Sequence, residues 1–129
     1  MEQAIPSTSS GQAPSTAPAQ VAMNAIAQAA RQATLALATE ALRRVVDPEM
    51  GINVVDMGLI AGMELHGDVI SLSYRLTSQT CPVGGMITAA MHDALEAVPG
   101  VLGAELHASQ DPPWGPELMT PEGRAALGL

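Results

Sequence analysis

Cys81 is the only cysteine in this chain of 129 residues, and its thiol is the side chain best suited to chemistry. It lies in the run TSQTCPVGG, residues 77–85, just before a segment with helical spacing. A helix N-terminus carries partial positive charge and free N–H groups, which favour a thiolate. The other interpretation is a buried cysteine that packs as a small apolar side chain. The small and polar residues of the loop favour an accessible thiol, but do not exclude packing.

Other side chains with metal-binding or catalytic chemistry give weaker signals. Asp47 and Glu49 flank Pro48 and would offer hard oxygen ligands if they faced the thiol, but on their own they indicate a helix stop and a solvated loop. Three imidazoles have no ligand spacing to one another or to the thiol, which disfavours a zinc site; they are His66, His92 and His107. A cysteine–histidine nucleophilic pair stays open, because its members need not be close in sequence.

The charge of the chain excludes several classes of partner. Thirteen acidic residues stand against five basic ones, which gives a formal net charge of −8. Such a chain repels phosphate, so we expect no nucleic acid and no anionic membrane as partner. A single cysteine cannot form an internal disulfide, and no secretory signal pattern is present. The Ala-rich stretch 21–38 contains Arg31 and several glutamines, so it is not a membrane span. We expect a cytoplasmic protein.

The composition divides the chain into two parts. Residues 1–20 are rich in Ser, Pro and Gly, and Ile5 is their only large aliphatic side chain. Such a stretch cannot bury enough apolar surface to offset its ordering entropy. Residues 21–33 have high helix propensity but a thin apolar stripe. We therefore expect residues 1–33 to be a disordered or partly helical low-complexity extension, and residues 34–129 to be one folded domain.

The first half of the domain shows helical and then alternating patterns. An apolar stripe predicts a helix over about 35–46, with Thr34 as its N-cap and Asp47–Pro48 as its end. A loop over residues 48–53 and an extended segment follow. Apolar and polar residues then alternate over about 59–66 and 69–77, on either side of a His-Gly-Asp turn. This pattern predicts an antiparallel hairpin with one buried face.

The second half supplies a crossover. A helix is predicted over about 84–98, a strand over 101–108, and a short helix that begins at Thr120–Pro121. The crossover helix would make the strands at 69–77 and 101–108 parallel neighbours. The predicted fold is α+β, with a small mixed sheet of three to four strands, helices mainly on one face, and the order α-β-β-α-β-α.

Three motifs, read together, resemble the SufT-like family, also called the MIP-eighteen or metal–sulfur cluster biosynthesis family. They are DPEMGINVVDMGLI (47–60), LTSQTCPV (76–83) and DPPW (111–114). The resemblance covers about residues 35–129 and implies an α+β domain that assists iron–sulfur cluster assembly or delivery. It also implies a cofactor-binding pocket, with the cysteine as metal ligand, and the matching residues are Asp47, Glu49, Thr77, Ser78 and Cys81.

The same family includes PaaD, the accessory subunit of the phenylacetyl-CoA oxygenase system. Chains of that type carry additional cysteines near the C-terminus, and the run up to Leu129 contains none. This departure favours the general cluster-assembly branch. A metal-free accessory subunit of a multicomponent oxygenase is the alternative, followed by a thiol-dependent enzyme.

The number of cysteine ligands that a cluster needs limits what a single thiol can do. A cluster takes four cysteine ligands, and one chain offers one. We therefore expect a transient iron–sulfur cluster or iron ion, shared with a partner or across a homodimer. The expected partners are other assembly proteins or client apo-proteins. These properties describe an assembly factor rather than an enzyme with turnover.

Overall fold

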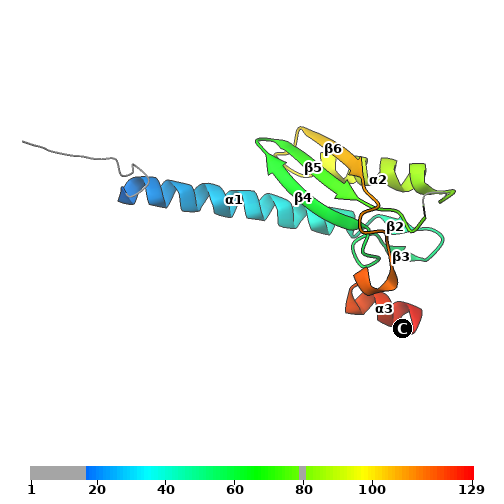
Figure 1. Cartoon of the computed structure of the whole chain (residues 1–129). Helices are drawn as coiled ribbons and strands as arrows, with labels where there is room; N and C mark the ends of the chain where they lie inside the picture. Colours follow the sequence, from blue (N-terminus) through cyan, green and yellow to red (C-terminus); the bar gives the residue numbers. More distant parts are fainter. Residues whose placement is uncertain (1–16, 79–80) are drawn as a thin grey trace, which may run out of the picture. The chain divides into compact units, whose positions relative to one another are not determined.

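A computed structural model describes residues 17–78 and 81–129 (Figure 1). They belong to two compact units, Met1–Ala33 and Thr34–Leu129. Residues 1–16 lie outside the described residues, and so does the expectation of disorder for them. The loop residues Gln79 and Thr80 lie outside as well. Within the described part of the chain, no helix is both long enough and apolar enough to cross a membrane.

The first helix, α1 (Pro18–Leu42), differs from the prediction at both ends. It begins earlier because residues 19–33, which follow Pro18 in the first turn, are mostly Ala and Gln and favour helix. Thr34 therefore lies inside the helix and does not cap it. The helix also stops earlier than predicted. The N–H groups of Arg44 and Val45 donate to carbonyls three residues back, those of Ala41 and Leu42, which tightens the last turn.

A two-stranded ladder follows where the sequence predicted a loop. Strands β2 (Val46–Asp47) and β3 (Ile52–Asn53) pair antiparallel, with Asp47 opposite Ile52. The turn between them closes because the Asp47 carbonyl accepts from the N–H groups of Met50 and Gly51, at 3.2 and 2.7 Å. Gly51 has φ = 72°, a conformation that glycine adopts without steric cost. Strands of two residues carry no periodic signal, so the sequence could not predict them.

The main sheet has three strands in the order β4-β5-β6: β4 (Ile60–His66), β5 (Val69–Tyr74) and β6 (Gly103–Ala108). β4 and β5 form the predicted antiparallel hairpin, and β5 and β6 are the predicted parallel neighbours. The α+β prediction, with its small mixed sheet, is therefore confirmed. Alternate side chains of β5 are buried and the intervening ones are half-buried. This is the alternation that predicted the hairpin.

Helix α2 (Gly84–Glu96) is the crossover between β5 and β6, and it packs beside β6 (Figure 1). Its apolar face carries Ile87, Met91 and Leu95, which join the buried side chains of β5 in one core cluster. The core is thus built mainly from aliphatic and methionine side chains, with Tyr74 as its one buried aromatic residue among those described.

The C-terminal segment contains a 3-10 turn, η2 (Pro116–Leu118), and helix α3 (Pro121–Leu127). Thr120 caps α3 as predicted, because its Oγ1 accepts from the N–H of Gly123 at 3.1 Å. Trp114 is half-buried against the core, and its indole N–H donates to the carbonyl of Met57.

Candidate functional site

The site is built around Cys81, whose sulfur lies 3.7 Å from Oε1 of Glu49. The thiol donates to this carboxylate across 32 positions of sequence, so the fold brings the two side chains together. Cys81 is half-buried and Glu49 is exposed. The pair therefore offers a sulfur ligand with partial access to solvent and a proton acceptor beside it.

Asp47 contacts the backbone of Glu49 and not the thiol itself. Its side chain is 1% exposed, and Oδ1 accepts from the backbone N–H of Glu49 at 2.9 Å. Its carbonyl also closes the turn at Gly51. Asp47 therefore holds the turn that carries Glu49. Within the described residues, Oδ2 of Asp47 is buried without a hydrogen-bond partner, so this carboxylate keeps spare capacity for a donor or cation.

The remaining predicted site residues lie in the loop before α2. The N–H of Cys81 donates to the carbonyl of Ser78 at 3.2 Å, and the carbonyl of Cys81 accepts from Gly84 at 3.2 Å. These bonds fix the backbone on both sides of the thiol. Thr77 is half-buried after β5, and the described residues show no hydrogen bond that joins it to Cys81 or Glu49.

Gly84, at the start of α2, lets the turn that carries Cys81 pack closely against the end of the hairpin. A Cβ at Gly84 would lie 2.8 Å from Cδ1 of Leu76 and 3.8 Å from Cβ of Cys81. The missing side chain lets the helix start pack directly against Leu76 at the end of the hairpin. The turn that carries Cys81 is held in place by this contact.

The three histidines lie beside carboxylates; His66 and His107 are exposed, and His92 is half-buried. His66 pairs with Glu64 at 3.0 Å, and His92 pairs with Glu96 at 3.5 Å. His107 lies on β6 with its side chain 59% exposed. Across residues 17–78 and 81–129, metal-ligating side chains gather in one group, His92, Asp93 and Glu96 on α2. Within the described residues, the three histidines do not gather around the thiol.

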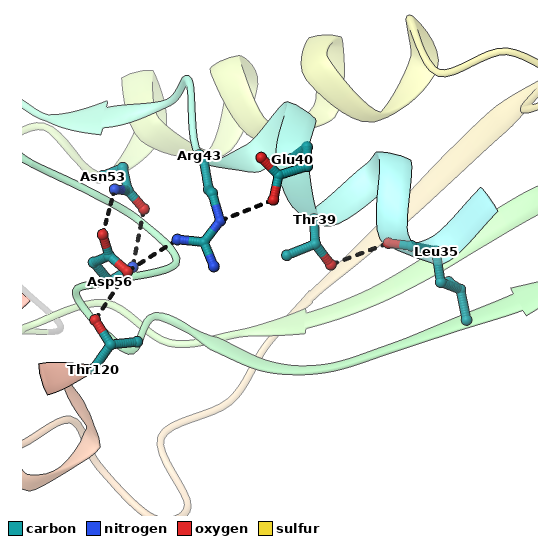
Figure 2. A network of polar contacts seen from close by, with 7 residues as sticks. All are labelled: Leu35, Thr39, Glu40, Arg43, Asn53, Asp56 and Thr120. Carbon is teal, nitrogen blue, oxygen red and sulfur yellow. Dashed lines mark hydrogen bonds and ion pairs between the residues drawn. The ribbon is translucent and has the colours of Figure 1, made fainter. Parts of the chain in front are cut away.

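A polar network centred on Asp56 joins parts of the chain that the sequence pattern did not predict to meet (Figure 2). Asp56 accepts from Nδ2 of Asn53 at 2.8 Å, from Oγ1 of Thr120 at 2.9 Å and from Arg43 at 3.1 Å. Arg43 also bonds Glu40 at 3.1 Å. The network ties the residues after α1 and β3 to the start of α3. The local pattern Asn-x-x-Asp was the only signal, because the other partners lie far away in sequence.

The charge of Asp56 contributes to stability with a definite pH dependence. Burial raises the pKa of this carboxyl, but the hydrogen bonds from Asn53, Thr120 and Arg43 outweigh burial and hold the pKa below its usual value. A lowered folded-state pKa stabilises the fold above the unfolded value of about 3.9, and this stabilisation disappears as the pH falls through the folded-state pKa.

We therefore expect Asp56→Asn to cost about 1–2 kcal/mol of unfolding free energy at pH 7. The cost should shrink as the pH falls below about 4, because protonation removes the same charge from the wild type. Urea unfolding of both proteins at several pH values measures the difference between their unfolding free energies. The titration of all other carboxyls contributes equally to both proteins and cancels in this difference. A pH-independent difference would show that the charge of Asp56 is not what its partners recognise.

Comparison with known proteins places this geometry in context. Residues 38–106 match the model of a family described as "Iron-sulfur cluster assembly protein". The chain is 34% identical over 90 residues to the Fe-S protein maturation auxiliary factor YitW of Bacillus subtilis, covering 69% of this chain and 88% of that protein. It is 31% identical over 86 residues to the Fe-S protein maturation auxiliary factor SufT of Staphylococcus aureus, covering 66% and 98%.

Two further similarities concern a longer protein and a solved structure. The chain is 43% identical over 61 residues to an iron-sulfur cluster carrier protein of Deinococcus radiodurans, a match that covers 47% of this chain and 17% of the longer protein. The crystal structure of a domain of unknown function from Bacillus anthracis superposes with a TM-score of 0.74 at 28% identity. That match covers 79% of this chain and 98% of the other.

Proposed function

The chain belongs to the iron–sulfur cluster assembly protein family, and from this premise we propose that it assists cluster assembly or delivery through the thiol of Cys81. The observation that carries the proposal is the contact between the Cys81 sulfur and the Glu49 carboxylate at 3.7 Å. A thiolate is a soft ligand that suits iron–sulfur clusters. A carboxylate within hydrogen-bond reach can take the proton that the thiol must lose.

The proposed step is a ligand exchange without electron transfer. As the Cys81 sulfur forms a bond to iron, its proton passes to Glu49, and a ligand of the donor leaves the same iron. Delivery reverses the step: a client thiolate binds the iron, the bond to Cys81 breaks, and the thiol recovers its proton. Asp47 keeps Glu49 in place, and Ser78 fixes the backbone of Cys81. We keep Thr77 as a proposed member of the site.

The cluster is cargo in this proposal, because one thiol cannot hold it alone. A cluster takes four cysteine ligands, so donor, client or a second copy of the chain must supply the others. Shared ligands suit a protein that receives and releases a cluster. Each client thiolate that binds the cluster can replace one ligand that the carrier supplied. We therefore propose that the partners are assembly proteins and client apo-proteins. We also propose that the protein acts in the cytoplasm.

A transfer assay tests the proposed function. A scaffold protein loaded with cluster is mixed under anaerobic conditions with an apo-enzyme that requires one, with and without this chain, and recovered enzyme activity is followed. We expect the chain to accelerate recovery, and iron to be found on the chain during transfer. If the rate does not change and no iron binds, a metal-free accessory role replaces the proposal.

The variant Glu49→Gln tests whether Glu49 acts as a proton acceptor or only fills space beside the thiol. The amide keeps the size of the side chain but cannot take the proton, so we expect roughly tenfold slower cluster acceptance at neutral pH. Glu105→Gln, an exposed change on β6 that removes the same charge, is the control. Equal rates for the two variants would remove Glu49 from the mechanism.

A further inference from the structure

An apolar groove lies between the end of α1 and helix α2, and its volume is about 560 Å³. We define this "α1–α2 groove" by six of its lining residues, which are Arg44, Val46, Pro48, Met86, Ile87 and Asp93. Apart from Arg44 and Asp93, every residue that lines it is apolar. All of the lining residues belong to one compact unit, Thr34–Leu129. A hollow of this size with apolar walls and few charges is typical of a binding site.

The α1–α2 groove adjoins the candidate site on both of its walls. On one wall, Pro48 is bonded directly to Asp47 and Glu49. On the other wall, Met86 lies in the first turn of α2, which begins three residues after Cys81. In the proposed exchange, a second protein binds the same iron as Cys81, so that protein must lie close to the groove. The groove is therefore placed where a cluster donor or client would contact the domain.

The shape of the groove favours a protein segment over a small molecule. Ile87 is 2% exposed, whereas Met86 and Val46 at the rim are 64% and 50% exposed. A pocket encloses most of a small ligand, but these rim side chains would stay in water around one. The groove follows α2 from Met86 to Ala97, which at the helical rise is about 16 Å, or three turns. An amphipathic helix of that length would cover both the buried floor and the exposed rim.

We propose that the α1–α2 groove binds a helix of the protein that exchanges the cluster with Cys81, through an apolar face that has a carboxylate at its edge. Arg44 selects the carboxylate. Among the described residues, the Arg44 guanidinium has no ion pair, whereas neighbouring Arg43 pairs with Glu40 and Asp56. A cation beside an apolar surface attracts a carboxylate more strongly than it would in open water. This inference rests on the proposed function, because it names the chemistry of the partner.

Asp93 gives the groove a second charge, of opposite sign, on the wall formed by α2. Its side chain is 84% exposed, so a basic side chain of the bound helix can pair with it. Opposite charges on the two walls fix the direction in which the helix lies. A second copy of this chain is a poor occupant, because two copies that each carry a net charge of −8 repel each other.

The affinity of the full chain for the apo-enzyme of the transfer assay, measured by isothermal titration calorimetry without cluster, tests the inference. We expect Met86→Asp and Arg44→Glu each to weaken binding about tenfold. The first places a charge in the apolar contact, and the second reverses the charge that pairs with the carboxylate. Leu102→Asp is the matched control, because Leu102 is 78% exposed and does not line the groove. Leu102→Asp and the charge-conserving Arg44→Lys should bind as the wild type does.

Loading of the same samples with ferrous iron and sulfide separates the groove from the thiol. Met86→Asp should load as the wild type does and should deliver slowly only when the apo-enzyme is limiting. Cys81→Ala should bind the apo-enzyme but should not load. Circular dichroism and urea unfolding check that each variant is folded.

Several results would overturn the inference. They are wild-type affinity in both Met86→Asp and Arg44→Glu, an equal loss of affinity in Leu102→Asp, and a wild type that does not bind the apo-enzyme. A Met86→Asp protein that changes its oligomeric state but not its affinity would assign the groove to a second copy instead. A wild type that binds through the groove but transfers no cluster would fail the proposed function and leave the groove standing.

Discussion

Replacement of Cys81 by alanine is expected to lower cluster transfer to the rate measured without the protein. Cys81 supplies the only thiol of the chain, so no other side chain can take its place as a sulfur ligand. The fold should tolerate the change, because the side chain is half-buried and the loss of one sulfur atom there costs about 1 kcal/mol or less. The expected phenotype is therefore loss of function in a folded protein.

The Cys81 experiment needs a readout of folding beside the transfer assay. Urea unfolding of Cys81→Ala checks that the domain is intact, and Ser73→Ala, a half-buried change on β5, serves as the control for transfer. Growth under iron limitation in the host, with the activity of a cluster-dependent enzyme as readout, extends the test to the cell. Full transfer by a folded Cys81→Ala protein would contradict the proposed role of the thiol.

The second large effect is expected at Gly58, between the core and the C-terminal segment. Gly58 has φ = 79°, and a Cβ there would overlap the backbone carbonyl of Leu118. Alanine must therefore accept a left-handed conformation and also displace the turn before α3. We expect Gly58→Ala to lower the unfolding free energy by about 2–4 kcal/mol. Trp114, the single tryptophan, donates to the carbonyl of neighbouring Met57 and reports the change by fluorescence.

Two other glycines separate the causes of the Gly58 effect. Gly67 has φ = 66°, and a Cβ there would meet no atom within 4 Å, so Gly67→Ala measures the conformational cost alone, about 1 kcal/mol. Gly123 has ordinary backbone angles, but its Cβ would overlap the carbonyl of Asp56, so Gly123→Ala measures the steric cost alone. If Gly58→Ala is no more destabilising than Gly67→Ala, close packing against Leu118 does not hold the C-terminal segment.

The sequence predicted the elements whose side chains repeat with a period. The alternation around Leu72 and the stripe through Met91 specified the hairpin and the crossover helix, and both formed as expected. The chain between Asp47 and Asn53 could not be predicted, because β2 and β3 are too short for a period. The sequence left the start of α1 open, because residues 21–33 have high helix propensity but only a thin apolar stripe; the helix extends to Pro18.

The members of the candidate site were named from the motif resemblance, and they remain a prediction. Nothing in the spacing of Glu49 and Cys81 indicates contact, and the pairing arose from the motif resemblance. The structure adds that the Asp47 carboxylate accepts from the backbone N–H of Glu49. Of the network of Asp56, only the link to Asn53 has a local signal in the sequence, because the other two partners, Arg43 and Thr120, lie 13 and 64 positions away.

Alkylation of the single thiol provides the most direct test of the central claim that Cys81 binds the iron of the cargo. The protein is loaded anaerobically from a cluster donor, treated with iodoacetamide, and its intact mass is followed over time beside the unloaded protein. Because the chain has one cysteine, one added mass reports Cys81 alone. We expect alkylation to be strongly slowed while the cluster is bound and to return to the unloaded rate after delivery to a client. Iron bound at full occupancy with an unchanged alkylation rate would contradict the account.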